Sequence, residues 1–174
     1  MKVNPIIIDY GVGNLYSLRK AIEFIGIKPI VSCDPNEITK ATHLFLPGVG
    51  SFFKATETLK KLNLFSLLKN LDYKNYKLMG ICLGMQMLFD SSTEDQFTNG
   101  LSLINGKIEK IDIKNQKDKK FKIPNIGWFN LKKNKINQNE DLFRGTNFLQ
   151  DKFYFVHSYY ASKVKDDVLK AFIK

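Results

Sequence analysis

The sequence predicts an α/β protein whose core is an open, mostly parallel sheet flanked by helices, followed by a β-rich C-terminal half. Two observations predict this class. In the first half of the chain, short apolar runs alternate with segments that have helical spacing, which is typical of strands and helices that build a parallel sheet. In the second half, aromatic and β-branched runs such as residues 153–158 (FYFVHS) indicate further strands.

The composition is that of a soluble globular protein of 174 residues, which is long enough for one domain with a substantial core. No apolar run approaches the roughly 20 residues of a membrane span, and the N-terminus leads into an expected strand, so we expect no membrane association. The two cysteines, Cys33 and Cys82, have no spacing typical of a metal site or a disulfide framework. This favours a reducing, cytoplasmic setting without a metal or cofactor.

The net charge of +10 raises the question of a nucleic-acid partner. The basic residues are mostly lysines, and no basic stripe carries interleaved aromatic residues, as a nucleic-acid surface would. We therefore interpret the charge as solvated faces and expect no nucleic acid as a partner.

The first expected strand spans residues 4–9 and contains three consecutive isoleucines. A glycine turn follows and presents Asn14, and a helix with apolar residues at helical spacing begins at Leu15 and ends at Gly26. A dinucleotide-binding turn would place a third glycine where Tyr16 stands, so we interpret this segment as a tight strand-to-helix turn.

The same alternation continues through residue 70. Residues 27–31 and 42–46 have the apolar character of strands. Asp34, followed by a proline and by a glutamate three residues after the cap, indicates the start of a helix. Helical spacing then predicts helices over residues 51–62 and 64–70. This pattern implies a largely parallel sheet covered on both faces.

The central stretch of the chain runs from a strand over residues 77–81, through Cys82, into an expected helix over residues 83–89. Its Gly-Ile-Cys-Leu-Gly sequence has the form of a nucleophile elbow, with cysteine where hydrolases of another family have serine. The helix N-terminus favours the thiolate of Cys82, and the Leu83 N–H points toward an oxyanion formed on an attacked carbonyl. A buried structural cysteine between two packing glycines explains these five residues equally well.

Two other loops support the interpretation of the elbow as a functional site. The glycines around Val49 leave its backbone free to reorient, so Val49 and Gly50 could supply a second oxyanion donor, although an ordinary strand-to-helix connection has the same sequence. Asn14, the Val49 loop and Cys82 each follow an expected strand. Because the carboxyl ends of parallel strands meet at one edge of a sheet, we expect the three to converge there.

The second half of the chain is expected to form a β-rich annex. Strands are predicted over residues 101–104, 107–113, 153–158 and 167–173, with a polar connection over residues 91–100 and a basic loop over residues 114–122.

Five stretches then carry a resemblance: residues 8–15 (IDYGVGNL), 46–52 (LPGVGSF), 80–86 (GICLGMQ), 123–128 (IPNIGW) and 153–160 (FYFVHSYY). Together they resemble the class I glutamine amidotransferases, and among them the glutaminase subunits of imidazole glycerol phosphate synthase. They fall in the family's order over nearly the whole chain. All members of the class share the elbow, whereas the opening stretch, the PGVG loop and FVHSYY together are specific to this kind of subunit and its close relatives. The resemblance implies a flavodoxin-like open sheet.

The resemblance also implies a mechanism. Cys82 attacks the side-chain amide of glutamine and releases ammonia, and water then hydrolyses the thioester. The Leu83 N–H and the backbone of Val49 and Gly50 hold the oxyanion. Gln86 and the backbone around Ser158 and Tyr159 position the glutamine, and Asn14 is a further candidate for this role.

In the family, the ammonia passes to a (β/α)₈-barrel synthase subunit that makes imidazole glycerol phosphate and AICAR in histidine biosynthesis. Trp128 and Asn125 match positions near this partner. The family commonly has histidine at the position of Asn125 and asparagine at that of Phe129. Because of this departure, a second candidate partner remains, namely a paralogous synthase that modifies sugars for surface polysaccharides.

A cysteine nucleophile needs a base and a proton donor for the leaving ammonia. The resemblance implies a downstream His-Pro-Glu segment, but the sequence ends at Lys174 without one. His43 is interpreted as a strand-end residue. His157 is the candidate base from the residues alone, whereas the resemblance assigns it to the substrate side, and we retain it as a substrate-binding residue.

We therefore expect residues 1–174 to form a single amidotransferase domain that lacks its C-terminal end, with severely impaired turnover in this form. A non-catalytic docking subunit is the alternative. An unrelated cysteine hydrolase that shares only the elbow is a third reading, but it would not account for the PGVG and FVHSYY segments.

Overall fold

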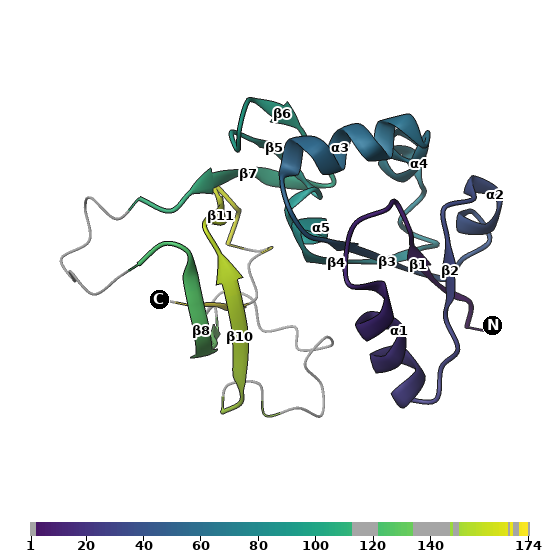
Figure 1. Ribbon diagram of the computed structural model, residues 1–174, viewed down its shortest axis with the longest axis horizontal. Coiled ribbons are helices and arrows are strands. Elements are labelled where there is room, and N and C mark those ends of the chain that lie inside the picture. The colour runs from purple at the N-terminus through teal and green to yellow at the C-terminus, as the bar shows by residue number, and fades with distance from the viewer. Residues whose placement is uncertain are drawn as a thin grey trace. The chain divides into compact units, whose positions relative to one another are not determined.

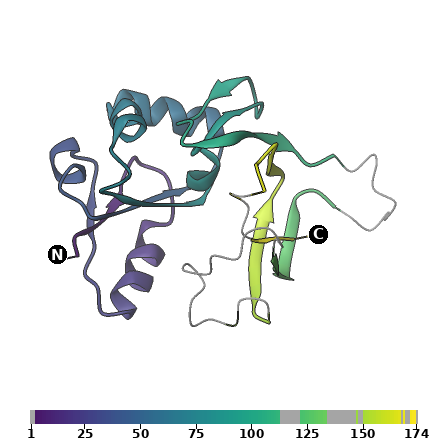
Figure 2. The same ribbon diagram turned by 180° about the vertical axis from the view of Figure 1, so that it is seen from behind.

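A computed structural model describes residues 3–112, 122–133, 147, 150–166, 168 and 171–173. The chain forms two compact units, Met1–Ile104 and Asn105–Lys174, and each is described by itself (Figures 1 and 2).

The first unit is built on a parallel sheet. Its described strands are β1 (Pro5–Ile8), β2 (Ile30–Ser32), β3 (His43–Gly48) and β4 (Lys77–Cys82), in the spatial order β2-β1-β3-β4. Ile6, Ile7 and Ile8 are fully buried, because a central parallel strand is covered on both faces. The predicted parallel sheet is confirmed, although β2 begins three residues later than expected and β3 continues to Gly48.

Helices cover both faces of this sheet. Figure 1 shows α1 (Leu15–Phe24) on one face, and α3 (Phe52–Lys61) and α4 (Leu64–Asn70) on the other. The short helix α2 (Pro35–Ile38) is capped by Asp34, whose carboxylate accepts a hydrogen bond from the Asn36 N–H, as predicted. Among the described residues, no helix is long and apolar enough to cross a membrane.

The segment after the elbow differs from the prediction. The helix α5 spans Leu83–Gln86 and ends three residues earlier than expected, and β5 (Phe89–Ser92) then pairs in antiparallel fashion with β6 (Thr98–Asn99) inside the predicted polar connection. The expected strand over residues 101–104 is instead an irregular segment that reaches β7 at its last residue. Its backbone donates hydrogen bonds to the carbonyls of Met87 and Leu88, which keeps that part of the chain out of the helix.

The second unit is rich in strands, as predicted. Antiparallel pairs form between β7 (Ile104–Lys110) and β11 (Tyr159–Ser162), between β8 (Asn125–Asn130) and β10 (Lys152–His157), and between β9 (Lys132–Lys133) and β12 (Ala171–Phe172). β7 ends three residues before the predicted boundary. The expected basic loop lies outside the described residues except for Lys122, as does part of the strand expected over residues 167–173.

Candidate active site

Cys82 is the last residue of β4 and the N-cap of α5, and its side chain is exposed. Its backbone has φ +55° and ψ −119°, a conformation that favours glycine and that other residues adopt at a cost. The strained strand-to-helix turn of a nucleophile elbow is therefore present. The alternative of a structural cysteine buried in the core is wrong.

The glycines around Cys82 allow an unusually close approach of backbones. A Cβ at Gly84 would lie 1.7 Å from the carbonyl oxygen of Leu46, and one at Gly80 would lie 2.5 Å from Cα of Met85. A Cβ at Gly48 would lie 2.7 Å from the Gly84 nitrogen. The end of β3 and the elbow therefore interlock through positions that accept only glycine.

This interlock places the β3–α3 loop, residues 49–51, beside the nucleophile. Gly48 pairs with Cys82 in the parallel register, and the loop follows directly after Gly48. The buried Tyr10 hydroxyl donates a hydrogen bond to the Pro47 carbonyl at 2.8 Å. Burial raises the pKa of Tyr10 above its ordinary value, and the charge of Cys82 raises it further. Tyr10 thus remains protonated and supports the start of the loop.

The start of α1 approaches the same loop. A Cβ at Gly13 would lie 3.2 Å from Cβ of Pro47, so the β1–α1 turn packs against the end of β3. Asn14 caps α1, and its side-chain oxygen accepts a hydrogen bond from the Ser17 N–H at 3.1 Å. The expected convergence of the loops is present. The side-chain oxygen of Asn14, however, is already engaged within its own helix.

Two carboxylates that the sequence analysis missed hold the far end of the β3–α3 loop. The Ser51 hydroxyl donates to Oδ2 of Asp95 at 2.6 Å, and the Phe52 N–H donates to Oε2 of Glu94 at 2.8 Å. Glu94 and Asp95 lie in the turn between β5 and β6, more than 40 positions along the chain. Local spacing carries no signal for such a contact.

Gln86 is half-buried and follows Cys82 by four positions. In a helical turn this spacing places both residues on the same side of the helix.

The remaining substrate-side candidates belong to the second unit. Nδ1 of His157 donates to the carbonyl of Tyr159 at 2.9 Å, and its Nε2 accepts from the side-chain amide of Asn125 at 3.1 Å. Because both ring nitrogens are engaged in the neutral form, the geometry gives no support to His157 as a general base. The Ser158 carbonyl accepts a hydrogen bond from the Ile111 N–H at 2.9 Å, so the corner between β10 and β11 is held from two sides.

One face of the β8–β10 hairpin carries exposed apolar side chains. Trp128 pairs with Tyr154, and Ile126 pairs with Val156. These four residues, which we call the hairpin face, are 51–65% exposed. The rings of Trp128 and Tyr154 lie 5.5 Å apart. Asn125 and His157 pair with each other on the opposite face.

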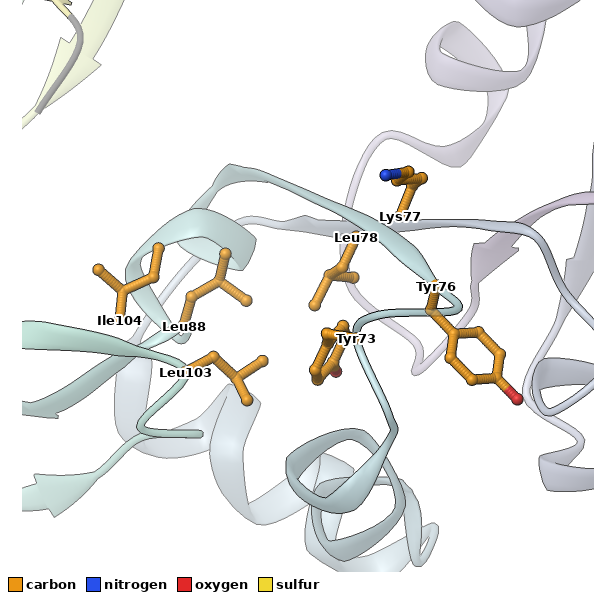
Figure 3. Close-up of a pocket in the computed structure, with 7 residues that line it drawn as sticks. All are labelled: Tyr73, Tyr76, Lys77, Leu78, Leu88, Leu103 and Ile104. Atoms are coloured by element: carbon orange, nitrogen blue, oxygen red, sulfur yellow. The ribbon is translucent and has the colours of Figure 1, made fainter. Parts of the chain in front are cut away.

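A hollow of about 340 Å³ lies elsewhere in the first unit. Figure 3 shows Leu78, Leu88 and Leu103 turned toward one another around it, with Tyr73 beside them. Its lining is mainly apolar and includes neither Cys82 nor the β3–α3 loop. Among the described residues, no group of three or more His, Cys, Asp and Glu side chains is placed to hold a metal.

Comparison with known proteins places this arrangement in a family. The family described as "Glutamine amidotransferase class-I" matches residues 6–173. The chain belongs to the class I glutamine amidotransferases. Within this class it belongs with the HisH subunits, because the "Imidazole glycerol phosphate synthase subunit HisH" of Bacillus subtilis is 39% identical over 165 residues, covering 95% of this chain and 76% of the relative. The protein of the same name from Halalkalibacterium halodurans is 42% identical over 165 residues, covering 95% of this chain and 75% of the relative.

A solved structure supports the amidotransferase fold independently. A protein described as "Crystal structure of glutamine amidotransferase" superposes with a TM-score of 0.64 at 13% identity, covering 92% of this chain and 75% of that chain. At this identity the likeness concerns the fold alone. It confirms the α/β class that the sequence predicts, and the family resemblance is confirmed by the HisH relatives.

Proposed function

We propose that this amidotransferase hydrolyses glutamine at Cys82 and supplies the ammonia for imidazole glycerol phosphate synthesis in histidine biosynthesis. The observation that carries the proposal is the exposed residue Cys82 on a strained elbow, interlocked with a loop that is rich in glycine. The names of the relatives support the pathway. They do not favour the alternative of a synthase that modifies sugars of surface polysaccharides.

In the proposed reaction, the Cys82 thiolate attacks the carbon of the glutamine side-chain amide, and the carbonyl oxygen becomes an oxyanion. The C–N bond breaks, and the nitrogen leaves as ammonia after taking up a proton. Water then cleaves the thioester, which releases glutamate and restores the thiol. The N–H of Leu83 and the backbone N–H groups of Val49 and Gly50 hold the oxyanion, because they border the elbow on its two sides.

We assign glutamine binding to Gln86, to the backbone at Ser158 and Tyr159, and to Asn14. Gln86 lies one helical turn after the nucleophile. The corner at Ser158 is held by the Ile111 N–H and the His157 ring, so its backbone is preorganised. His157 contributes to substrate binding by holding this corner.

We further propose that the hairpin face docks the partner, a (β/α)₈-barrel synthase subunit. Aromatic side chains such as Trp128 are enriched at protein interfaces, and a contiguous exposed apolar patch is typical of a binding surface. Asn125 supports this face from behind by pairing with His157 across the hairpin. A reducing, cytoplasmic setting agrees with two cysteines that are free and exposed in the described structure.

The decisive experiment is alkylation by a chloroketone analogue of glutamine, followed by peptide mass spectrometry. This reagent requires the nucleophile and the substrate site but no complete catalytic cycle. We expect modification of Cys82, protection by free glutamine, and little modification of Cys33, which is also exposed. Equal labelling of both cysteines, or labelling of neither, would count against a glutaminase site. Intact glutamine after mixing with the synthase subunit, despite binding, would favour a non-catalytic docking subunit.

A further inference from the structure

The middle of the β3–α3 loop has little packing of its own. Val49 is 53% exposed, and Gly50 has φ +89°. Within the described part of the chain, no atom outside the neighbouring residues lies within 4 Å of a Cβ built at Gly50. The position of the backbone N–H groups in this loop therefore depends on how its two ends are held.

The first end is held by the interlock with the elbow, through Gly48 and Gly84. The second end is held by a side chain. Ser51 caps α3, and its hydroxyl has one hydrogen, which it donates to Asp95 at 2.6 Å. This leaves the Ser51 oxygen to accept a hydrogen bond from the Lys54 N–H at 3.4 Å. Asp95 thus fixes the orientation of the capping hydroxyl.

The turn that carries Asp95 is itself shaped for this contact. Asp95 adopts φ +59°, which costs free energy for a residue other than glycine. The hydroxyl of Ser92 accepts a hydrogen bond from the Glu94 N–H at 3.1 Å, and the Glu94 carboxylate accepts the N–H of Phe52, the next residue after Ser51. Two consecutive carboxylates therefore hold two consecutive residues at the end of the loop.

The turn that carries Asp95 belongs to the same continuous segment of the chain as Cys82. β5 begins three residues after α5 ends, and the turn with Asp95 follows β5 directly. The elbow contacts the start of the β3–α3 loop through the glycine interlock and the end of the same loop through Asp95. The distance between Cys82 and the loop is set at both ends by the segment that carries Cys82.

We propose that Asp95 is a positioning residue for the oxyanion donors: through Ser51 it holds residues 49–51 at the distance from Cys82 that glutamine hydrolysis requires. Asp95 acts on the loop and touches no reacting atom. The proposal rests on the proposed function, because it concerns the same oxyanion.

Two reagents for Cys82 separate this role from a general effect on the fold. When the Cys82 sulfur attacks the ketone carbon of the chloroketone analogue, the carbonyl oxygen becomes an oxyanion, and the sulfur then moves to the neighbouring carbon as the C–Cl bond breaks and chloride leaves. Iodoacetamide instead loses iodide by direct displacement, without an oxyanion intermediate. Rates are measured in a Cys33→Ser background. We expect Asp95→Ala to lower the limiting rate of chloroketone inactivation about tenfold, with little change in the concentration for half-maximal rate and in the iodoacetamide rate.

Matched variants sharpen the test. Ser51→Ala should slow the chloroketone reaction at least as much as Asp95→Ala, because it removes the cap contact with the Lys54 N–H as well as the hydrogen bond to Asp95. The double variant should be no slower than Ser51→Ala, because the two single variants share the Ser51–Asp95 hydrogen bond. Ser51→Thr and Asp95→Asn keep a donor and an acceptor and should recover most of the rate. Gln96→Ala, an exposed neighbour in the same turn, should leave both rates unchanged.

An unchanged chloroketone rate in Asp95→Ala, or an equal loss with both reagents, would overturn the proposal. A failure of the parent protein to react selectively at Cys82 would overturn the proposed function and this proposal with it. Selective labelling of the parent with an unchanged Asp95→Ala would overturn the positioning role alone.

Discussion

Cys82 is exposed, and its backbone is strained. A residue with φ +55° and ψ −119° lies where glycine is favoured, and conformations of this kind cost about 1–3 kcal/mol. The strain is sustained by the close backbone contacts of Gly80 and Gly84, which leave the turn no room to relax. Stability is therefore lowered at the residue on which the proposed chemistry depends.

We expect Cys82→Gly to be about 1 kcal/mol more stable than Cys82→Ala, because glycine relieves the strain and the greater freedom of the unfolded chain offsets only part of the gain. Urea unfolding of both variants measures the difference. Met79, half-exposed in the regular part of β4, provides the control, where glycine should be less stable than alanine. A Cys82→Gly variant that is less stable than Cys82→Ala would show that the turn is unstrained.

At the scale of residues, sequence patterns predicted those features that depend on residues close together in the chain. The cap at Asp34 is set by neighbours within a few positions and was predicted correctly, and the sharp turn at Cys82 lies where the Gly-Ile-Cys-Leu-Gly pattern indicated it. The contact of Ser51 with Asp95 joins residues 44 positions apart, and the pair of Asn125 and His157 joins residues 32 positions apart. Contacts between residues so far apart cannot be predicted from the periodicity of a single sequence.

At the scale of elements, the segment after Cys82 shows how tertiary contacts override propensity. Leucine and methionine favour a helix over residues 83–89, yet α5 ends at Gln86. The carbonyls of Met87 and Leu88 accept hydrogen bonds from residues 101–104, so the chain leaves the helix there. With four residues, α5 is too short to develop a large dipole.

Strands β8 and β10 carry the hairpin face, which is exposed in the described structure. We expect Trp128→Ala to weaken binding of the synthase subunit by about 2 kcal/mol, or roughly 30-fold, because a central aromatic side chain commonly dominates an interface. Calorimetric titration with the purified synthase subunit measures this. The free energy of unfolding should change by less than about 1 kcal/mol, since Trp128 is 65% exposed and loses mainly its contact with Tyr154.

Phe24, an even more exposed aromatic residue at the end of α1, serves as the control for the hairpin variant. Its replacement by alanine should leave the affinity unchanged. Equal weakening by both variants, or by neither, would contradict the assignment of the hairpin face.

At the scale of the whole molecule, two tyrosines link stability to alkaline pH. Burial raises the pKa of Tyr73 to about 12, and burial together with the charge of Cys82 raises that of Tyr10. Above pH 10 the unfolded chain releases these protons while the native state retains them. The unfolded state then binds fewer protons, so the free energy of unfolding falls as pH rises.

We expect the stability to decrease above pH 10, with a contribution from Tyr10 of about 1.4 kcal/mol per pH unit. In Tyr10→Phe this contribution disappears, so the slope should be smaller although the protein is less stable at neutral pH, where it lacks the hydrogen bond to Pro47. Urea unfolding between pH 8 and about 11 measures both slopes. Identical slopes would show that Tyr10 ionises in the native state.

The architecture of the whole chain was predictable to the extent that strands and helices alternate. The carboxyl-end edge followed from the parallel pattern, and there Gly13, Pro47, Gly48 and Cys82 come together. The ends of β2, β7 and α5 were displaced, because strand and helix ends depend on pairing partners that lie elsewhere in the sequence. The hairpin within residues 91–100 was missed because its polar side chains, such as Ser91, Ser92 and Thr98, are buried by packing that hydropathy does not indicate.

The hairpin face has a consequence for the behaviour of the chain when no partner is bound. Four apolar side chains on two paired strands would bind other copies of the chain, or chaperones, whenever no partner covers them. Copies of the chain that lack a partner would therefore tend to associate through this face, and more so at higher concentration. Under the proposed docking, the synthase subunit covers this face and limits such self-association.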